Sequence, residues 1–334
     1  MARALRLALE KTGRQVEIAS ELRTRDADGD PDRQDALFAA ARAEIPALAE
    51  RGRAAGWACW VTYHCYFKAP DLLGPSVSAA LDIPYVLIEA TRARKRLTGP
   101  WARFADASER ACDAADLIFY FTERDGETLL ARAPAGQRVR PLAPFLPVAH
   151  APEPSRRDGP MLSVGMFRTG DKLASYRLIA ETLGLMQSVH WRLDIAGDGP
   201  AAPEIRALMR PFGDRVRFLG ELGPDALSEA YARAALLFWP GVNEAFGLSY
   251  LEAQAAGLPV VAQDRPGVRD VLAPGDHPSP EDGARALANR LDKLMASPGL
   301  RRSRGEAARA HVIRHHLIDT AADRLDAGLR EVGA

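Results

Sequence analysis

The chain has 334 residues, more than one hydrophobic core usually organises, so two domains are expected. Its 44 basic and 44 acidic residues balance, which argues neither for nor against a polyanionic partner, and no nucleic-acid partner is predicted. No apolar run is long enough to span a membrane, the start lacks a signal-peptide core, and the three cysteines lack zinc-type spacing, so a cytoplasmic protein is expected.

The first domain, predicted over 1–145, begins with a helix over 1–11 and a strand over 16–19. Since a doubly wound sheet normally opens with a strand, the true start is expected upstream, or the opening strand has been lost. An apolar, aromatic run over 57–63 predicts a central strand, and His64 stands at its carboxyl end. Ligands of open α/β sheets bind at these ends, so His64 is a candidate contact, with a structural role left open.

Two charged stretches of the first domain can each be interpreted either as solvent-exposed surface or as a binding site. The acidic turn around Asp26, Asp28 and Asp30 has the spacing of a metal loop, but Pro31 stands where a calcium loop needs glycine, so a solvated loop is predicted. The basic run over 92–96 is interpreted as a solvated face, and a contact with an anionic group such as a lipid phosphate is the alternative.

The second domain is predicted over 160–315, after a linker over 141–160 that holds six prolines. Strands are expected over 161–165, 191–196 and 216–220, each ending at a glycine or running into one. His311 and His315 lie one helical turn apart, and structural histidines are favoured over a metal site there. A C-terminal helix within 316–334 is expected to pack back on the first domain.

The most informative stretch follows an apolar strand over 235–239. Its loop carries Glu244 and Gly247, a helix starts near Leu248, and Glu252 lies one turn into that helix. The first N–H groups of a helix bind phosphate, Gly247 allows close approach of a ligand, and carboxylates accept hydrogen bonds from hydroxyls. A ligand that is part phosphate and part polyol is predicted. The alternative is a capping box, in which Glu252 only bonds the start of its own helix near Ser249.

The stretch over 243–261, NEAFGLSYLEAQAAGLPVV, resembles the signature of retaining family-four glycosyltransferases, the glycosyl transferases group 1, of GT-B fold. The resemblance implies two Rossmann-like doubly wound domains that face a central cleft. It also implies transfer of a sugar from a nucleoside-diphosphate donor to the hydroxyl of a sugar or lipid-linked acceptor. No metal and no cofactor beyond that co-substrate are implied. A peripheral contact with the inner face of the membrane is compatible with it, and the oligomeric state is not indicated.

The resemblance also assigns roles to individual residues. Glu244 and Lys172 match catalytic positions, but Met166 stands where the family has an arginine, and Arg168 is the nearby substitute. Glu89 stands where the family often has a histidine, so His64 and Glu89 become candidates on the acceptor side. Donor contacts are expected from Gly165, Gly197, Phe218, Phe246, Gly247, Leu248 and Glu252.

Three other functions stay open from the sequence alone. Met166, Glu89 and the missing opening strand are compatible with a nucleotide-sugar-binding or scaffold protein of impaired activity. A nucleotide-sugar 2-epimerase shares the fold but needs acid and base groups that the sequence does not identify. A P-loop nucleotidase is the weakest alternative, because Asp171 separates Gly170 from Lys172.

Overall fold

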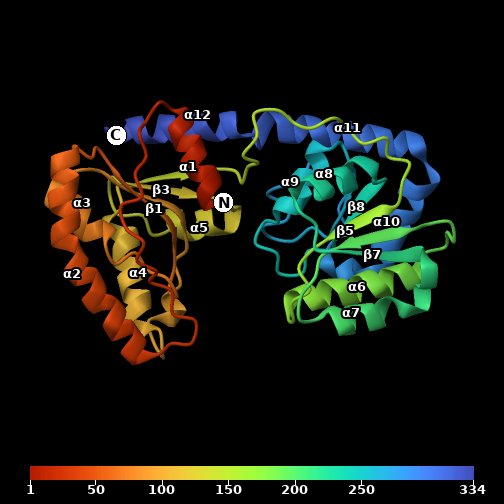
Figure 1. Cartoon of the computed structure of the whole chain (residues 1–334), viewed down its shortest axis with the longest axis horizontal. Coiled ribbons are helices and arrows are strands. Elements are labelled where there is room, and N and C mark those ends of the chain that lie inside the picture. Colours follow the sequence, from red (N-terminus) through yellow and green to blue (C-terminus); the bar gives the residue numbers. More distant parts are fainter. The chain divides into compact units, whose positions relative to one another are not determined.

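The computed structural model describes all 334 residues, which form two units. The first unit comprises Met1–Ala143 and Ala321–Ala334, and the second comprises Pro144–Thr320. Each unit contains one parallel sheet, with the order β1-β2-β3-β4 in the first and β7-β6-β5-β8-β9 in the second. Figure 1 shows each sheet with its own helices. The C-terminal end of the chain therefore belongs to the same unit as its beginning.

The strands of the first unit follow one another across the sheet in chain order, so the reversal of a doubly wound sheet occurs only in the second unit. The strand expected over 57–63 forms as β1 but lies at the edge of this sheet, so the prediction of a central position is wrong. The two middle strands are apolar because helices cover them. The elements of this unit are α1 (Ala2–Lys11), α2 (Pro31–Ala55), β1 (Trp60–Cys65), α3 (Gly74–Leu81), β2 (Tyr85–Ala90), η1 (Arg94–Arg96), α4 (Ala102–Ala114), β3 (Leu117–Tyr120), α5 (Glu123–Leu130), β4 (Arg138–Pro141) and α12 (Ile318–Glu331).

The strand predicted over 16–19 does not form, and that prediction is wrong. The stretch is held by side chains of other elements rather than by a sheet ladder: Trp57 donates to the Glu17 carboxylate at 2.9 Å, and Arg51 donates to the Ala19 backbone carbonyl. Ile18 is 62% exposed, so the stretch gains no buried apolar face from joining the sheet.

The acidic turn is not wholly solvated, as the sequence predicted, because Asp26 is fully buried. Its carboxylate accepts from the Gln34 side chain at 2.8 Å and from the backbone N–H groups of Asp28 and Gly29 at 3.0 and 3.1 Å. Burial opposes the charge, but these hydrogen bonds prevail and lower the pKa of Asp26. Asp26 therefore organises the turn that leads into α2.

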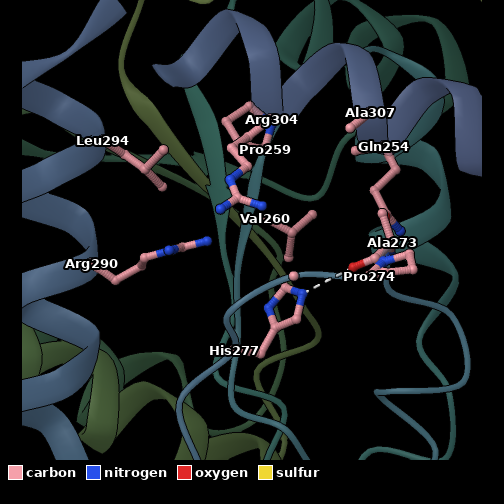
Figure 2. A pocket seen from close by; sticks show the side chains of 12 residues that line it. Gln254, Pro259, Val260, Ala273, Pro274, His277, Arg290, Leu294, Arg304 and Ala307 are labelled. Carbon is pink, nitrogen blue, oxygen red and sulfur yellow. Dashed lines mark hydrogen bonds between the residues drawn. The ribbon is translucent and has the colours of Figure 1, made fainter. Parts of the chain in front are cut away.

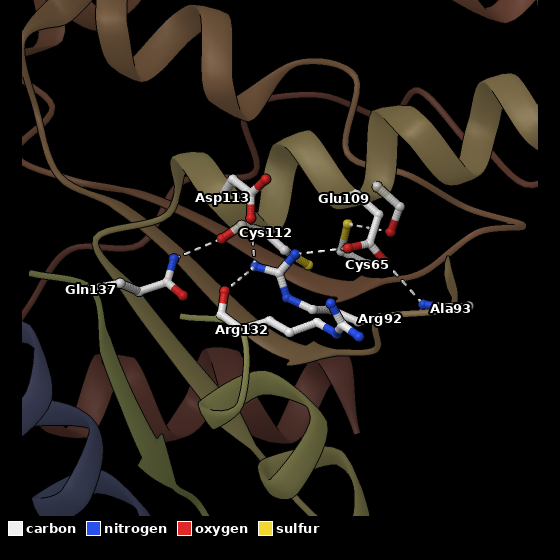
Figure 3. A network of polar contacts seen from close by, with 9 residues as sticks. Cys65, Arg92, Ala93, Glu109, Cys112, Asp113, Arg132 and Gln137 are labelled. Carbon is white, nitrogen blue, oxygen red and sulfur yellow. Dashed lines mark hydrogen bonds and ion pairs between the residues drawn. The ribbon is translucent and has the colours of Figure 1, made fainter. Parts of the chain in front are cut away.

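The basic run over 92–96 has one buried arginine and three exposed basic residues. The Arg92 side chain is only 4% exposed and binds Glu109 at 2.8 Å and Asp113 at 2.7 Å, both on α4, as Figure 3 shows. The prediction of a solvated face is thus wrong for Arg92, whose ion pairs join the end of β2 to α4. Arg94, Lys95 and Arg96, which form η1, are exposed.

The second unit has β5 at the centre of its sheet, paired with β6 on one side and β8 on the other. Ligands of such sheets bind outside the carboxyl ends of the strands at this reversal of order. The elements are β5 (Met161–Val164), α6 (Asp171–Leu185), β6 (Leu193–Ala196), α7 (Ala202–Met209), η2 (Arg210–Arg215), β7 (Val216–Gly220), α8 (Pro224–Arg233), β8 (Leu236–Phe238), α9 (Leu248–Ala255), β9 (Val260–Val261), η3 (Pro280–Asp282), α10 (Gly283–Ala296) and α11 (Pro298–His315).

None of these helices combines the length and the apolar character needed to cross a bilayer.

Candidate active site

The carboxyl end of β5 is the first wall of the candidate site. Gly165 follows this strand, and its carbonyl accepts a hydrogen bond from the Tyr176 hydroxyl at 2.8 Å. A Cβ at Gly165 would lie 2.7 Å from the Trp239 ring, so glycine allows that ring to pack directly on the backbone. A Cβ at Gly197, after β6, would lie 2.0 Å from the Gly165 carbonyl oxygen. The two predicted donor-binding glycines therefore come together, and each backbone requires the absence of a side chain.

An ion pair joins the loops that follow β5 and β8. Lys172, in the first turn of α6, has its Nζ atom 2.5 Å from Oε2 of Glu244. The Trp239 indole donates to the same oxygen at 3.2 Å, and its ring centroid lies 5.3 Å from Nζ. The side chains of Lys172 and Glu244 are 23% and 16% exposed, so water screens their charges only partly. The structure thus brings two of the three predicted catalytic residues together.

Arg168, the third predicted catalytic residue, is not part of this cluster. Its side chain is exposed and has no hydrogen-bond or ion-pair partner. Met166, at the position of the family arginine, is 47% exposed. The loop after β5 therefore presents one arginine to solvent, two positions beyond the place that the resemblance implies.

The loop before α9 is held by its neighbours rather than by a capping side chain. Asn243 has a φ of +47° and donates to Asp171 at 2.8 Å, which ties this loop to the start of α6. Gly247 is the N-cap of α9 with a φ of +71°, and no side chain caps the helix. The N-terminal end of α9 remains electropositive without a compensating side-chain oxygen. Leu248 is its first residue, and the half-buried Phe246 packs against the core of the unit.

Glu252 does not return to the start of α9, so the capping-box alternative is wrong. Its carboxylate accepts a hydrogen bond from the Tyr231 hydroxyl of α8 at 2.9 Å. Burial raises the pKa of Glu252, although the hydrogen bond from Tyr231 acts in the opposite direction. Burial and the nearby Glu252 raise the pKa of Tyr231 far above its usual range, so the hydroxyl keeps its proton.

Phe218 of β7 makes different contacts. Its ring meets Phe167 edge-on at 6.2 Å between centroids, and the Arg206 guanidinium lies 4.4 Å from its ring centroid. These are packing contacts on the β7 side of the sheet, and they do not include the Lys172–Glu244 pair.

In the first unit, the register of β1 and β2 sets the two predicted acceptor-side residues side by side. His64 Nδ1 lies 3.2 Å from Oε2 of Glu89. Both residues lie inside strands, yet both have left-handed backbones, with φ of +69° and +61°. Such strain in residues with a Cβ costs about 1–3 kcal/mol each and often marks functional sites. Burial, followed by the neighbouring Glu89, raises the pKa of Tyr63.

The histidines at the end of α11 are part of the packing of the second unit. His311 Nε2 lies 3.2 Å from Nε2 of His316, whose Nδ1 lies 2.7 Å from the Pro144 carbonyl. No group of three or more His, Cys, Asp or Glu residues is arranged to hold a metal ion.

Sequence reasoning missed three residues that shape the site. Trp239 supports both members of the ion pair, and Tyr231 holds Glu252. A Cβ at Gly267 would lie 1.9 Å from the Ala245 carbonyl oxygen, so the loop after β9 lies directly on the loop of Glu244. Trp and Tyr inside apolar elements were the available signal, because buried aromatic N–H and O–H groups need partners.

Residues 161–297 match the family described as glycosyl transferases group 1. The chain carries a group 1 glycosyltransferase domain. Its sheet of five strands, the ion pair and the N-terminal end of α9 all lie within the matched range. The chain is 27% identical over 288 residues to the alpha-D-kanosaminyltransferase of Streptomyces kanamyceticus, covering 81% of this chain and 74% of that protein. It spans only 21–31% of the length of five other curated relatives.

Solved structures show the same GT-B fold beyond the group 1 domain. Sucrose-phosphate synthase from Thermosynechococcus elongatus has a TM-score of 0.70 at 18% identity, over 99% of this chain and 92% of that chain. HepE of Anabaena, solved in complex with UDP-glucose, has a TM-score of 0.64 at 15% identity, over 86% of this chain and 82% of that chain. The α/β fold with two parallel sheets is that of GT-B glycosyltransferases.

Proposed function

We propose that this protein is a retaining glycosyltransferase that transfers a sugar from a nucleoside-diphosphate donor to an acceptor hydroxyl. The observation that carries the proposal is the Lys172–Glu244 pair at the switch point of the second sheet, beside the glycine N-cap of α9. The cation and the helix terminus suit a diphosphate, and the adjacent carboxylate suits the hydroxyls of a sugar.

The donor side follows from the charge that develops during transfer. The bond between the anomeric carbon and the phosphate oxygen breaks, and its electron pair leaves with the diphosphate. Lys172 and the backbone N–H groups at the start of α9 stabilise this negative charge, and each such donor accounts for about 3 kcal/mol when removed singly. Glu252, held by Tyr231, binds the ribose hydroxyls, and Glu244 binds the transferred sugar. The stabilisation comes from fixed protein groups, so the reaction is expected to proceed without a divalent metal.

Retention of configuration follows from attack on the same face that the diphosphate leaves. The acceptor oxygen bonds to the anomeric carbon as its proton passes to a leaving phosphate oxygen, so no second carboxylate is needed as a nucleophile. HepE, a structural neighbour, was solved with UDP-glucose, which makes UDP-sugars the first donors to test. On the acceptor side, His64 and Glu89 bind the hydroxyl-bearing end of a sugar or a lipid-linked acceptor. A peripheral contact with the membrane follows only for the lipid-linked case.

The test combines binding and product analysis. Calorimetry with UDP, GDP, ADP and dTDP measures whether a nucleoside diphosphate binds, and one of them is expected to bind more tightly than the others. Transfer from the matching sugar donor is then measured with EDTA present, and the anomeric configuration of the product is read by NMR. Absence of binding by all four nucleotides in a folded sample would overturn the proposal, and an inverted product would overturn retention alone.

A second candidate is a protein that binds nucleotide-sugars without transferring them. It is favoured by Met166, which is 47% exposed where the family has an arginine, and by the exposed Arg168. Donor binding with neither transfer nor donor hydrolysis would support this candidate. Restored turnover in a Met166→Arg variant would then identify the missing charge as the cause.

A further inference from the structure

A pocket lined by apolar residues and by two arginines lies at the β9 edge of the second unit, away from the carboxyl ends that carry the predicted donor contacts. It is shown in Figure 2, and its cavity volume is about 30 Å³. The start of β9, the loop after residue 272, α10 and α11 contribute to its walls. Its lining residues include Arg290, Arg304 and His277 but no Asp or Glu, and they share no member with the candidate active site.

The two guanidinium groups converge from different helices. Arg290 reaches in from α10 and Arg304 from α11, and His277 faces them from the loop (Figure 2). A Cβ at Gly275 would lie 3.4 Å from His277 Nε2 and 3.7 Å from Arg304 Nη1, so both side chains crowd over the same backbone turn. The His277 ring donates from Nε2 to the Ala273 carbonyl at 3.1 Å, since a carbonyl only accepts.

The positive charges of this pocket are poorly compensated. The Arg290 side chain is 13% exposed, and its one acidic partner is Asp276 at 3.4 Å, which is itself 84% exposed. Arg304 has no ion-pair partner. Burial, followed by repulsion from Arg304, lowers the pKa of Arg290, and burial lowers the pKa of His277, with Asp264 and Asp276 acting in the opposite direction. Two arginines held together in this way raise the energy of the protein unless an anion joins them.

We propose that Arg290 and Arg304, which converge beside His277, form a binding site for a phosphate group. Each guanidinium presents a planar fork of N–H donors, and a phosphate offers several acceptor oxygens in different directions, so it can bridge both forks. Its charge, about −1.5 to −2 for a monoester at pH 7, matches the two arginines better than the single charge of a carboxylate. The group belongs either to free phosphate or to a phosphorylated sugar, whose remaining atoms extend through the open mouth.

The pocket is built on elements that also serve the candidate active site. Gln254 of α9 lines it, and its side chain accepts from the Ala273 N–H at 2.7 Å and donates to the Val271 carbonyl at 2.8 Å. These bonds fasten the loop of His277 to the helix that carries Glu252. The site is nevertheless independent of the proposed transfer reaction, since none of its ligands comes from the donor-binding set.

The experiment compares the full chain with Arg290→Gln, Arg304→Gln and the double variant. Arg302→Gln is the matched control, because Arg302 is exposed on α11, the helix of Arg304, and the substitution removes the same charge outside the pocket. Thermal unfolding and calorimetry are measured with inorganic phosphate, at an ionic strength held constant with sodium chloride. Phosphate is expected to raise the unfolding midpoint of the wild type and of Arg302→Gln. Binding is expected to weaken at least tenfold in each single variant and to vanish in the double variant.

Two further measurements identify the molecule that carries the phosphate and test whether phosphate binds at the donor site instead. Tighter binding of glucose 1-phosphate than of inorganic phosphate indicates a sugar phosphate, and equal or weaker binding indicates the free ion. A Lys172→Ala variant is expected to keep the phosphate response, since Lys172 serves the other site. In phosphate-free buffer the single variants are expected to unfold at or above the wild-type midpoint, because the repulsion between the arginines is gone. An absent phosphate response in the wild type, or an equal response in the double variant, would overturn the site.

Discussion

The two units each hold an acid–base pair at the carboxyl ends of parallel strands, and they hold it in different ways. In the first unit, His64 and Glu89 lie inside β1 and β2, 3.2 Å apart, with left-handed backbones of their own. In the second unit, Lys172 and Glu244 lie beyond their strands, and the left-handed backbones beside them belong to Asn243 and Gly247. In the first unit the acid and the base themselves carry the backbone strain, whereas in the second unit the left-handed positions fall on neighbouring glycine and asparagine, which tolerate them better.

The largest effect is expected from breaking the pair of the second unit. Lys172→Ala and Glu244→Ala each remove a group from the donor side, and kcat/KM for sugar transfer is expected to fall about 10²- to 10³-fold. Lys293→Ala, at an exposed lysine of α10, is the matched control and is expected to keep full activity. Circular dichroism checks that the variants are folded. Normal turnover in a folded Lys172→Ala or Glu244→Ala variant would show that the pair is structural.

The next effect concerns stability in the first unit. Asp26→Asn replaces a buried carboxylate that accepts from Gln34 and from two backbone N–H groups, so about 1–3 kcal/mol of unfolding free energy should be lost at pH 7. The folded pKa of Asp26 is lowered, so its stabilising charge is present above the unfolded value of 3.8 and is lost as the pH falls through the folded value. The difference from wild type should therefore shrink on acidification below 3.8.

The exposed neighbour Asp28 provides the control for this experiment. Asp28→Asn keeps the backbone N–H that Asp26 accepts from, and its effect should stay within about 0.5 kcal/mol. Equal losses in the two variants, measured by denaturant unfolding, would mean that the burial of Asp26 contributes nothing specific.

The contrast between the units also explains what could be predicted from the sequence. The strand before Glu244 was visible because it is a continuous apolar run, and the loop and helix after it were marked by Gly247 and by the run up to Pro259. These signals are local in the sequence. The strands of the second unit, and the candidate site residues Glu244 and Gly247 in the loop after β8, could therefore be predicted from neighbouring residues. Local spacing also suggested the capping-box alternative, which is wrong because the partner of Glu252 is Tyr231, a residue of another helix.

The first unit was harder to predict because its pairings are long-range. The contact of His64 with Glu89 depends on the register of two strands, and no glycine marks either left-handed residue. The predictions missed β4, because its residues Arg138–Pro141 alternate basic and apolar side chains and end in proline. Asp26 looked like one more exposed acid, since only the folded turn buries it against Gln34.

Strain at Glu89 can be measured by comparing glycine with alanine. At a left-handed position glycine should be the more stable of the two by about 1 kcal/mol, because only alanine meets the steric penalty. At Glu127, an exposed position of α5, the order should reverse by about the same amount. In the second unit, Gly247→Ala should destabilise, since the added Cβ would lie 2.8 Å from the Tyr250 ring. Chemical denaturation of these variants gives the free energies, and alanine outranking glycine at Glu89 would refute stored strain.

The smallest expected effect concerns how stability depends on pH, which should have opposite signs for the two buried carboxylates, Glu252 and Asp26. The pKa of Glu252 is raised by burial, so the folded state binds more protons than the unfolded state at pH values above the unfolded 4.5. Stability due to Glu252 therefore falls as the pH rises through this window, the opposite of Asp26. Glu252→Gln should be more stable than wild type at neutral pH, and this advantage should disappear as the pH approaches 4.5. A constant difference across the range would mean that the hydrogen bond from Tyr231 stabilises the carboxylate enough to cancel the effect of its burial.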